Sequence, residues 1–421
     1  MLADWLDRLE RRNRDRIVLG LDRVRAVRQR LGLHPHFPLI TVGGTNGKGS
    51  TCAFLESMLS AAGYKVGCYT SPHLLRYNER VRVDGREVSD EALCASLEAV
   101  ETARGDIPLT YFEQGTLAAM HRFLQAGLDV AVLEVGLGGR LDAVNAWDTD
   151  CAVITSVDLD HQSFLGDDRE SIGYEKAGIM RTGKPAICGD ARPPSRLLEH
   201  AGEIGAGIWR MGRDITVEYH EHDWLCRVPG LAMPALPRPA MPGRHQYGNA
   251  ACALAALASV RERLPVSLNA LRLGVAAARQ PGRFQLLGRT PTRILDVAHN
   301  PHAARALADS LADLPPGGTL HGVFSVLADK DFEGVVKPLL GRIRHWHVAG
   351  LDIPRGLSTG ELKSRIAALG GDATGYVDIA EAWWSACRLA GPADTIVAFG
   401  SFHTVAGVLQ ATSGERPEIH D

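Results

Sequence analysis

The residues best suited to chemistry lie in one glycine-rich stretch, residues 43–51, with the sequence GGTNGKGST. Its glycines allow a tight turn in which successive N–H groups point into one hollow, and Lys48 adds a mobile positive charge. An apolar run, 37–42, precedes the stretch and an amphipathic run, 52–62, follows it, so we expect the hollow to lie at the positive end of a helix. The alternative is an ordinary turn between a strand and a helix. The stretch lacks two positions of the strict Walker pattern and therefore predicts a shortened phosphate-binding loop.

Polar side chains also follow other predicted strands. Glu134 ends the apolar run LDVAVLE, and a carboxylate in that place can organise Mg²⁺ beside a phosphate loop. Ser71 ends another strand, where it contacts a metal or phosphate or else forms a Ser-Pro turn, and the segment alone does not decide between these. A third strand is followed by Asp158, Asp160 and His161. His161 is a candidate metal ligand, although single histidines are more often satisfied polar residues.

Three further places carry candidate residues. Tyr111 and Phe112 begin a predicted helix and could clamp a flat heterocycle, although such a pair is more often part of a core. The glycine-rich segment GLGGRLD is expected to wrap around a ligand and to present Arg140 and Asp142. Taken by itself, Lys176 in the predicted helix RESIGYEKAGI is expected on the surface.

The composition limits the classes of protein to be considered. The apolar fraction of 45% and the charged fraction of 23% are typical of a soluble globular protein. A net charge of −3 and a pI of about 6.6 offer no basic footprint for nucleic acid. The eight cysteines form no CxxC pair, which indicates buried free thiols in a reducing compartment. No apolar stretch has the length of a signal peptide or a membrane span, so we expect a cytoplasmic protein that binds neither nucleic acid nor membranes.

The order of predicted elements indicates an α/β protein of two domains. Residues 1–280 are expected to form a P-loop ATPase-like domain with a mostly parallel sheet, with a hairpin turning at Asp84-Gly85 and a proline-rich loop at 231–243. The sequence RQPGRF, 279–284, breaks a helix and marks the boundary. Strands and helices then alternate through 281–421, which predicts a smaller Rossmann-like α/β domain.

The second domain carries polar residues where its first clear strand ends, at Asp296, His299 and Asn300. It has no glycine-rich phosphate loop of its own. We therefore expect it to close over the nucleotide held by the first domain.

Nine motifs in sequence order carry a resemblance to a known family. They are GTNGKGST, TSPHL, YFEQGT, LEVGLGGRLDAVN, DHQSFLG, EKAGI, PGRFQ, DVAHNPHA and GSFHTVA. Together the chain resembles the folylpolyglutamate synthase and dihydrofolate synthase family, which belongs to the wider group of ATP-dependent Mur-type ligases. The resemblance covers nearly the whole chain and is closest to the bifunctional bacterial enzymes.

The resemblance implies a two-step reaction. A pterin-type carboxylate attacks the γ-phosphate of ATP to give an acyl phosphate and ADP, and the amino group of L-glutamate then displaces phosphate to form an amide. The implied substrates are ATP, L-glutamate, dihydropteroate and reduced folates. The implied cofactors are Mg²⁺, as two ions, together with a monovalent cation, and the protein is expected to act as a monomer.

The resemblance also implies roles for individual residues. Those expected to bind ATP are Thr45, Asn46, Gly47, Lys48, Gly49 and Ser50, with Asn249, Arg283, Asp296 and His299. Those expected to hold magnesium are Ser71, Glu134 and His161. Substrate-binding residues are Ile17, Val18, Leu19, Thr110, Tyr111, Phe112, Arg140 and Leu141 on the pterin side and Ser401 and His403 on the glutamate side. The catalytic set is Lys48, Glu134, His161 and Lys176, the last matching a lysine that the family carbamylates.

Three alternatives are weighed against a bifunctional ligase. A synthase restricted to one of the two steps would share these motifs, although YFEQGT and the LGL segment favour the use of dihydropteroate. A Mur-type ligase for a peptidoglycan precursor usually places a nucleotide-sugar domain before the phosphate loop, and only 43 residues precede Gly44. A nucleotide-dependent switch would not need the full set of metal-side groups.

Overall fold

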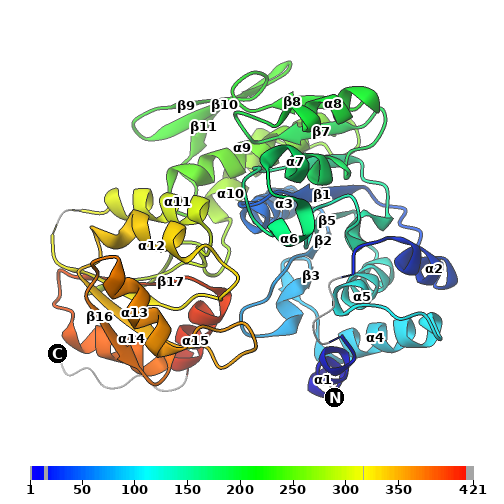
Figure 1. Ribbon diagram of the computed structural model, residues 1–421. Coiled ribbons are helices and arrows are strands. Elements are labelled where there is room, and N and C mark those ends of the chain that lie inside the picture. Colours follow the sequence, from blue (N-terminus) through cyan, green and yellow to red (C-terminus); the bar gives the residue numbers. More distant parts are fainter. Residues whose placement is uncertain (1, 14–17, 316, 414–421) are drawn as a thin grey trace. The chain divides into compact units, whose positions relative to one another are not determined.

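The computed structural model describes residues 2–13, 18–315 and 317–413. The chain divides into two compact units (Figure 1). The first unit comprises residues 1–240 and 246–279, and the second comprises 241–245 and 280–421. The segment 241–245, which the sequence analysis assigned to the first domain, groups with the second unit instead.

The first unit is built on an eight-stranded sheet with the order β4-β3-β2-β5-β1-β6-β7-β8. Its strands are β1 (Leu39–Gly43), β2 (Val66–Tyr69), β3 (Val81–Val83), β4 (Arg86–Glu87), β5 (Val130–Glu134), β6 (Cys151–Ile154), β7 (Pro185–Cys188) and β8 (Gly207–Arg210). Only β3 runs against the other strands, because it pairs antiparallel with β2 on one side and with β4 on the other, and β3 and β4 form the predicted hairpin. Because β5 and β6 flank the central β1, with Val42 paired to Glu134 and Gly43 to Ile154, their carboxyl ends meet at one edge.

Helices surround this sheet. They are α1 (Leu2–Asn13), α2 (Asp22–Arg30), α3 (Lys48–Ala61), α4 (Asp90–Arg104), α5 (Tyr111–Ala126), α6 (Gln162–Leu165), α7 (Arg169–Ala177), α8 (Ser195–Glu203), α9 (Arg244–Ser259) and α10 (Leu268–Ala277), with the short 3₁₀ turns η1 (Tyr77–Arg80) and η2 (Ala143–Ala146). The prediction of an amphipathic run at 52–62 is wrong, because α3 is buried on most of its surface. Its outer side is covered by α10, where Gly274 lies directly against Met58.

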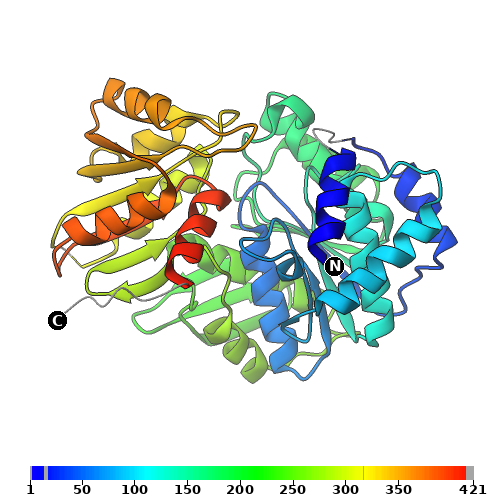
Figure 2. The ribbon, with the colours of Figure 1, turned by 90° about the horizontal axis from the view of Figure 1, so that it is seen from below.

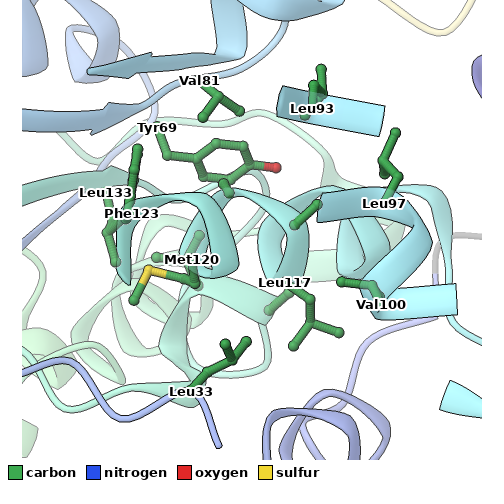
Figure 3. Close-up of a cluster of buried hydrophobic side chains, with 14 of the residues drawn as sticks. Leu33, Tyr69, Val81, Leu93, Leu97, Val100, Leu117, Met120, Phe123 and Leu133 are labelled. Carbon is green, nitrogen blue, oxygen red and sulfur yellow. The ribbon is translucent and has the colours of Figure 1, made fainter. Parts of the chain in front are cut away.

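A large apolar cluster joins α4 and α5 to the sheet. Figure 3 shows side chains of α4, among them Leu97, facing those of α5, among them Met120 and Phe123, with Tyr69 and Leu133 from the strands. Burying each such side chain contributes about 1.5–3 kcal/mol to folding. In Figure 2 the N-terminal helix α1 lies beside α4 and α5, and Leu9 is fully buried in this cluster. The cluster thereby fixes the start of α5.

A three-stranded antiparallel sheet follows β8, formed by β9 (Thr216–Tyr219), β10 (Asp223–Val228) and β11 (Leu231–Pro237). The prediction of a proline-rich loop at 231–243 is therefore wrong for its first half. Proline is tolerated because β11 is an edge strand. The register shifts between Trp224 and Cys226, where two residues of β11, Pro234 and Ala235, stand opposite one residue of β10, so Pro234 lies in the bulge itself.

The second unit contains a six-stranded sheet with the order β12-β13-β17-β14-β15-β16. Its elements are β12 (Gln285–Arg289), β13 (Thr292–Leu295), α11 (Pro301–Ala312), β14 (Leu320–Phe324), α12 (Phe332–Leu340), β15 (His345–Ala349), α13 (Thr359–Ala368), β16 (Ala373–Tyr376), α14 (Ile379–Leu389), β17 (Thr395–Phe399) and α15 (Phe402–Ser413). Only β12 runs antiparallel to its neighbour. The predicted alternation of strand and helix is confirmed.

The cysteines are free thiols, as predicted. Seven are buried and Cys387 is half-buried. Burial raises the pKa of each thiol, to about 11 for Cys387. Within the described ranges, the structure contains no helix with the length and apolar character needed to cross a bilayer.

Candidate active site

The glycine-rich stretch forms the turn between β1 and α3. Gly44 and Gly47 have φ angles of 144° and 88°, which side chains rarely adopt. A Cβ atom on Gly44 would collide with Thr155, and one on Gly47 would collide with the amide oxygen of Asn249. The turn is thus closely packed, and Asn249 lies against it from α9.

Polar groups after β6 hold the first half of this turn. The Thr45 N–H donates to the Ser156 carbonyl at 2.8 Å, and the Asn46 N–H donates to Ser156 Oγ at 3.0 Å. The Thr45 hydroxyl donates to the Asp158 carbonyl at 3.1 Å. Sequence reasoning did not identify Ser156, because a serine after a strand carries no distinctive signal.

The second half of the turn is an open helix start. Gly47 precedes α3 and provides no side-chain cap, so the first N–H groups of the helix, including those of Gly49 and Ser50, have no partner within the helix. Lys48 Nζ donates to the carbonyls of Gly44 at 3.0 Å and Thr45 at 3.2 Å, which keeps its charge beside the turn. This combination suits a phosphate group.

Two of the predicted metal ligands lie together. The Ser71 N–H donates to Glu134 Oε2 at 3.0 Å, and Glu134 is buried. Glu134 also lies beside the phosphate turn, because it is paired with Val42, the residue that immediately precedes the turn. A buried carboxylate oxygen suits a hard cation.

His161 lies in the loop after β6. Its side chain is 41% exposed, and Nε2 is 3.9 Å from Asp160 Oδ1. Nowhere in the described parts of the chain do three or more His, Cys, Asp or Glu side chains form a group able to hold a metal by themselves. This fits Mg²⁺, which commonly takes one or two protein carboxylates and completes its shell with water and substrate phosphates.

Lys176 is buried in α7, with 3% exposure, so the expectation of a surface position is wrong. Burial lowers its pKa to about 7, helped by the charge of Lys48 and opposed by Asp160. Lys176 is therefore close enough to Lys48 for the two charges to affect one another. A substantial share of its amine is neutral near pH 7, and a neutral amine is nucleophilic.

Asp142 is buried rather than presented to a ligand as expected. Its carboxylate accepts hydrogen bonds from the N–H groups of Gly136 at 3.1 Å, Leu137 at 2.9 Å and Val144 at 2.9 Å, and so organises the glycine-rich loop. Burial raises its pKa to about 7, against the effect of these N–H groups and of Lys48.

The predicted pterin-side residues come from three segments. Ile17 lies outside the described residues, while Val18 is 42% exposed and Leu19 half-buried. The next residue, Gly20, donates its N–H to the Leu141 carbonyl at 3.2 Å. The segment 18–20 is thus joined to the loop after β5.

The other pterin-side residues approach the same loop. Thr110 caps α5, and Tyr111 and Phe112 are half-buried against the apolar cluster, so they serve partly as core. The Phe112 ring lies so close to Gly136 that a Cβ atom there would be 2.6 Å from it. Arg140 is engaged in an ion pair with Glu175 Oε1, at 2.7 Å.

In the second unit, the charge of Arg283 reaches Asp296, and its guanidinium lies 5.7 Å from the centre of the Phe402 ring. Asp296 accepts the N–H groups of Phe284 at 2.9 Å and Ala298 at 2.8 Å. Burial raises the pKa of Asp296, while Arg283 lowers it. His299 packs against the same Phe402 ring, with centroids 5.9 Å apart.

Of the two residues assigned to the glutamate side, Ser401 is buried and His403 is exposed. Ser401 Oγ accepts the Thr404 N–H at 3.0 Å at the start of α15. Its visible role is therefore to cap that helix. Partial desolvation of the imidazole lowers the pKa of His403, and the positive charge of Arg355 lowers it further.

Comparisons with known proteins agree with this arrangement. The Mur ligase middle domain family matches residues 42–257, and the Mur ligase glutamate ligase domain family matches residues 282–402. The chain is 48% identical over 416 residues to the dihydrofolate synthase/folylpolyglutamate synthase of Escherichia coli K12, covering 99% of this chain and 96% of the relative.

Solved structures show the same similarity. Escherichia coli FolC in complex with DHPP and ADP is 48% identical, with a TM-score of 0.94 over 98% of this chain and 97% of that chain. The bifunctional folylpolyglutamate synthase/dihydrofolate synthase of Yersinia pestis, complexed with AMPPNP and Mn ion, is 46% identical, with a TM-score of 0.92 over 98% of both chains.

Proposed function

Because this chain belongs to the dihydrofolate synthase/folylpolyglutamate synthase family of Mur ligases, we propose that it joins L-glutamate to dihydropteroate and to tetrahydrofolate species at the expense of ATP. The observation that carries the proposal is the end-to-end similarity to bifunctional relatives. The position of Glu134 beside the phosphate turn agrees with it. A relative has been solved with Mn, AMPPNP and L-glutamate bound. This similarity favours a folate ligase over a peptidoglycan-precursor ligase.

The first step places the terminal phosphate of ATP at the start of α3. The N–H groups of Gly49 and Ser50 and the charge of Lys48 stabilise negative charge as the substrate carboxylate attacks. On binding, Lys48 exchanges the carbonyls of Gly44 and Thr45 for phosphate oxygens. The product is an acyl phosphate, which is an electrophile that a free carboxylate is not.

Magnesium would be held by Glu134 and Ser71, with His161 as a further ligand, and when bound it offsets the charge of the phosphates. The local geometry supports this assignment for Glu134, whose buried carboxylate accepts the N–H of Ser71 and so lies beside a second proposed ligand. We assign nucleotide contacts outside the turn to Asn249, Arg283, Asp296 and His299.

Lys176 is the residue we assign to carbamylation. The ammonium group first loses one proton, and the neutral amine then adds to CO₂, forming an N–C bond and releasing a second proton, so that the buried cation becomes an anion. The pKa of about 7 supports this role, because burial and Lys48 both disfavour the charged amine. The carbamate would then attract Lys48 instead of repelling it.

The proposal is tested by ADP release from purified protein supplied with ATP, magnesium, L-glutamate and either dihydropteroate or tetrahydrofolate. We expect ADP release with each of the two acids. Continued release should require L-glutamate. Release with only one acid would restrict the protein to a single-step synthase. Absence of release with both would reject the ligase, and turnover independent of glutamate would indicate a nucleotide switch.

A further inference from the structure

One arginine outside all the predicted sets connects the segments expected to hold the pterin. Arg23, in α2, donates from Nη2 to the Val18 carbonyl at 2.7 Å. The same guanidinium donates to Glu113 Oε1 from Nε at 3.1 Å and from Nη2 at 2.7 Å, and from Nε to Oε2 at 3.2 Å. A planar guanidinium that contacts two partners in this way fixes both distance and direction.

Glu113 has a second task at the start of α5. Its Oε2 accepts the Thr110 N–H at 2.7 Å, and its own N–H donates to the Thr110 hydroxyl at 3.2 Å, which is a capping box. The carboxylate is buried, with 3% exposure. Without Arg23 this carboxylate would lose its cationic partner while remaining desolvated, so the helix start would have to move or take up water.

The partners of this guanidinium coincide with the expected substrate residues. Val18 belongs to the first pterin-side segment, and Thr110 immediately precedes Tyr111 and Phe112 in the second. The neighbouring Gly20 is bonded to Leu141 of the third segment. Arg23 thus lies at the junction of all three segments but is not itself among the residues expected to touch the pterin.

We infer that Arg23 is a positioning residue for the pterin-type substrate, holding segment 18–20 and the start of α5 at the separation that the flat ring requires. This inference rests on the proposed function. A misplacement of about 1 Å in a substrate-positioning group can cost a reaction about 100-fold. The ATP side is not expected to show such a dependence, because among the described residues the hydrogen-bond partners of Arg23 are Val18 and Glu113, and neither belongs to the phosphate turn.

The chain offers a matched control in Arg12 of α1. Its guanidinium forms a two-point ion pair with Glu101 of α4, at 2.9 and 2.8 Å. This pair joins α1 to α4. The two arginines are similarly exposed, 28% for Arg12 and 24% for Arg23, whereas Glu101 is more exposed than Glu113, at 19% against 4%. Glu101 also accepts a hydrogen bond from Gln114 Nε2 of α5 at 3.2 Å, but among the described residues neither member of the control pair has a hydrogen bond to an expected pterin-side residue.

The test measures kcat and the KM values for dihydropteroate and for ATP in wild type, Arg23→Lys, Arg23→Ala and Arg12→Ala, with urea unfolding of each. Lysine keeps the charge but cannot reproduce the two-point contact. We expect Arg23→Lys to raise the KM for dihydropteroate by about tenfold or more, with the KM for ATP changed by less than about twofold. Arg12→Ala should leave both KM values unchanged.

The possible outcomes distinguish failure of the positioning role from failure of the proposed function. An unchanged KM for dihydropteroate in folded Arg23→Lys, or an equal rise of both KM values, would overturn the positioning role while the ligase stands. Failure of both Arg23 variants to fold would overturn it in favour of a purely structural ion pair. Wild-type protein that releases no ADP with dihydropteroate or tetrahydrofolate would overturn the proposed function and the inference with it.

Discussion

The two parallel sheets both deliver polar residues to their carboxyl edges, but the helices that follow begin differently. In the first unit, α3 starts at Gly47 with no side-chain cap. In the second unit, Asn300 caps α11 through the Ala303 N–H at 2.9 Å, and Ser401 caps α15 through the Thr404 N–H at 3.0 Å. A helix start that the protein caps itself is closed to a ligand, whereas an uncapped one attracts an anion.

The two units also differ in the buried ionisable side chains near these edges. In the first unit, burial brings the pKa values of Lys176 and Asp142 both to about 7, so small changes in the site can move their protons. In the second unit, Asp296 is held by two N–H groups and by the charge of Arg283. Burial raises the pKa of Asp296 as well, so the clearer differences at the first edge are its open helix start and its buried lysine, which agree with the proposal that phosphate chemistry takes place there.

The largest effect is expected from Glu134→Gln. Removing this carboxylate takes away the anionic metal ligand, so turnover should fall by about 1000-fold, or ~4 kcal/mol in barrier height. Folding should survive, because the amide oxygen can still accept the Ser71 N–H. ADP release and thermal melting check both parts. Turnover within a few-fold of wild type would remove Glu134 from the mechanism and weaken the contrast between the two edges.

Gly47→Ala should follow in size, because the new Cβ would collide with Asn249 and a φ of 88° strains any side chain. We expect a loss of ATP-dependent turnover of about 100-fold. The matched control is Gly85→Ala, at φ 70° with no atom within 4 Å of the added Cβ, where only the strain of about 1–2 kcal/mol applies. Equal losses of activity in the two variants would indicate that strain alone, and not the packed turn, is responsible.

Lys176→Met tests the buried charge through the dependence of stability on pH. The folded-state pKa of about 7 lies below the unfolded value of 10.5, so Lys176 destabilises the protein fully below pH 7 and progressively less as the pH rises towards 10.5. Unfolding of the variant should therefore require more free energy than that of wild type at pH 6, and this advantage should be about 3 kcal/mol smaller at pH 9.

CO₂-free buffers are the control in that experiment, because they exclude carbamylation. Asp142 has the opposite dependence, since its raised pKa makes it destabilising as the pH rises from about 4 to 7, but it is present in both proteins and cancels in the difference. A difference independent of pH would contradict the assigned burial of a titrating amine.

The smallest effect is expected from Ser401→Ala. Loss of the cap should lower the free energy of unfolding by about 1 kcal/mol. If capping is its only task, the KM for glutamate will not change, which urea unfolding and steady-state kinetics can establish. A rise in that KM without loss of stability would instead support the glutamate-side role and would blur the contrast between capped and open helix starts.

Much of this architecture follows from local sequence. Glycine spacing marks the phosphate turn, and alternating apolar runs mark the strands of both units. The acidic strand end at Glu134 is visible for the same reason, because a carboxylate that interrupts an apolar run has no structural explanation of its own. The T-x-x-E spacing from Thr110 to Glu113 is likewise a readable capping signal.

The remainder depends on contacts that are distant in sequence. Nothing near Lys176 indicates that α7 carries it inward, and the burial of α3 depends on α10, which follows it by more than 200 residues. Asp142 appeared to face a ligand because its loop hydrogen bonds are made to backbone groups, which leave no trace in residue types. The strand β11 was not predicted because its prolines indicated a loop, whereas an edge strand tolerates proline.

The sequestered thiols have a practical consequence. Thiol reagents attack the thiolate, and burial suppresses ionisation at every native cysteine, including the half-buried Cys387. A cysteine introduced at a position such as Val377, whose side chain is 86% exposed, should therefore react with maleimide far faster than the native ones. A single fluorophore can thus be attached at such a position without first replacing any native cysteine.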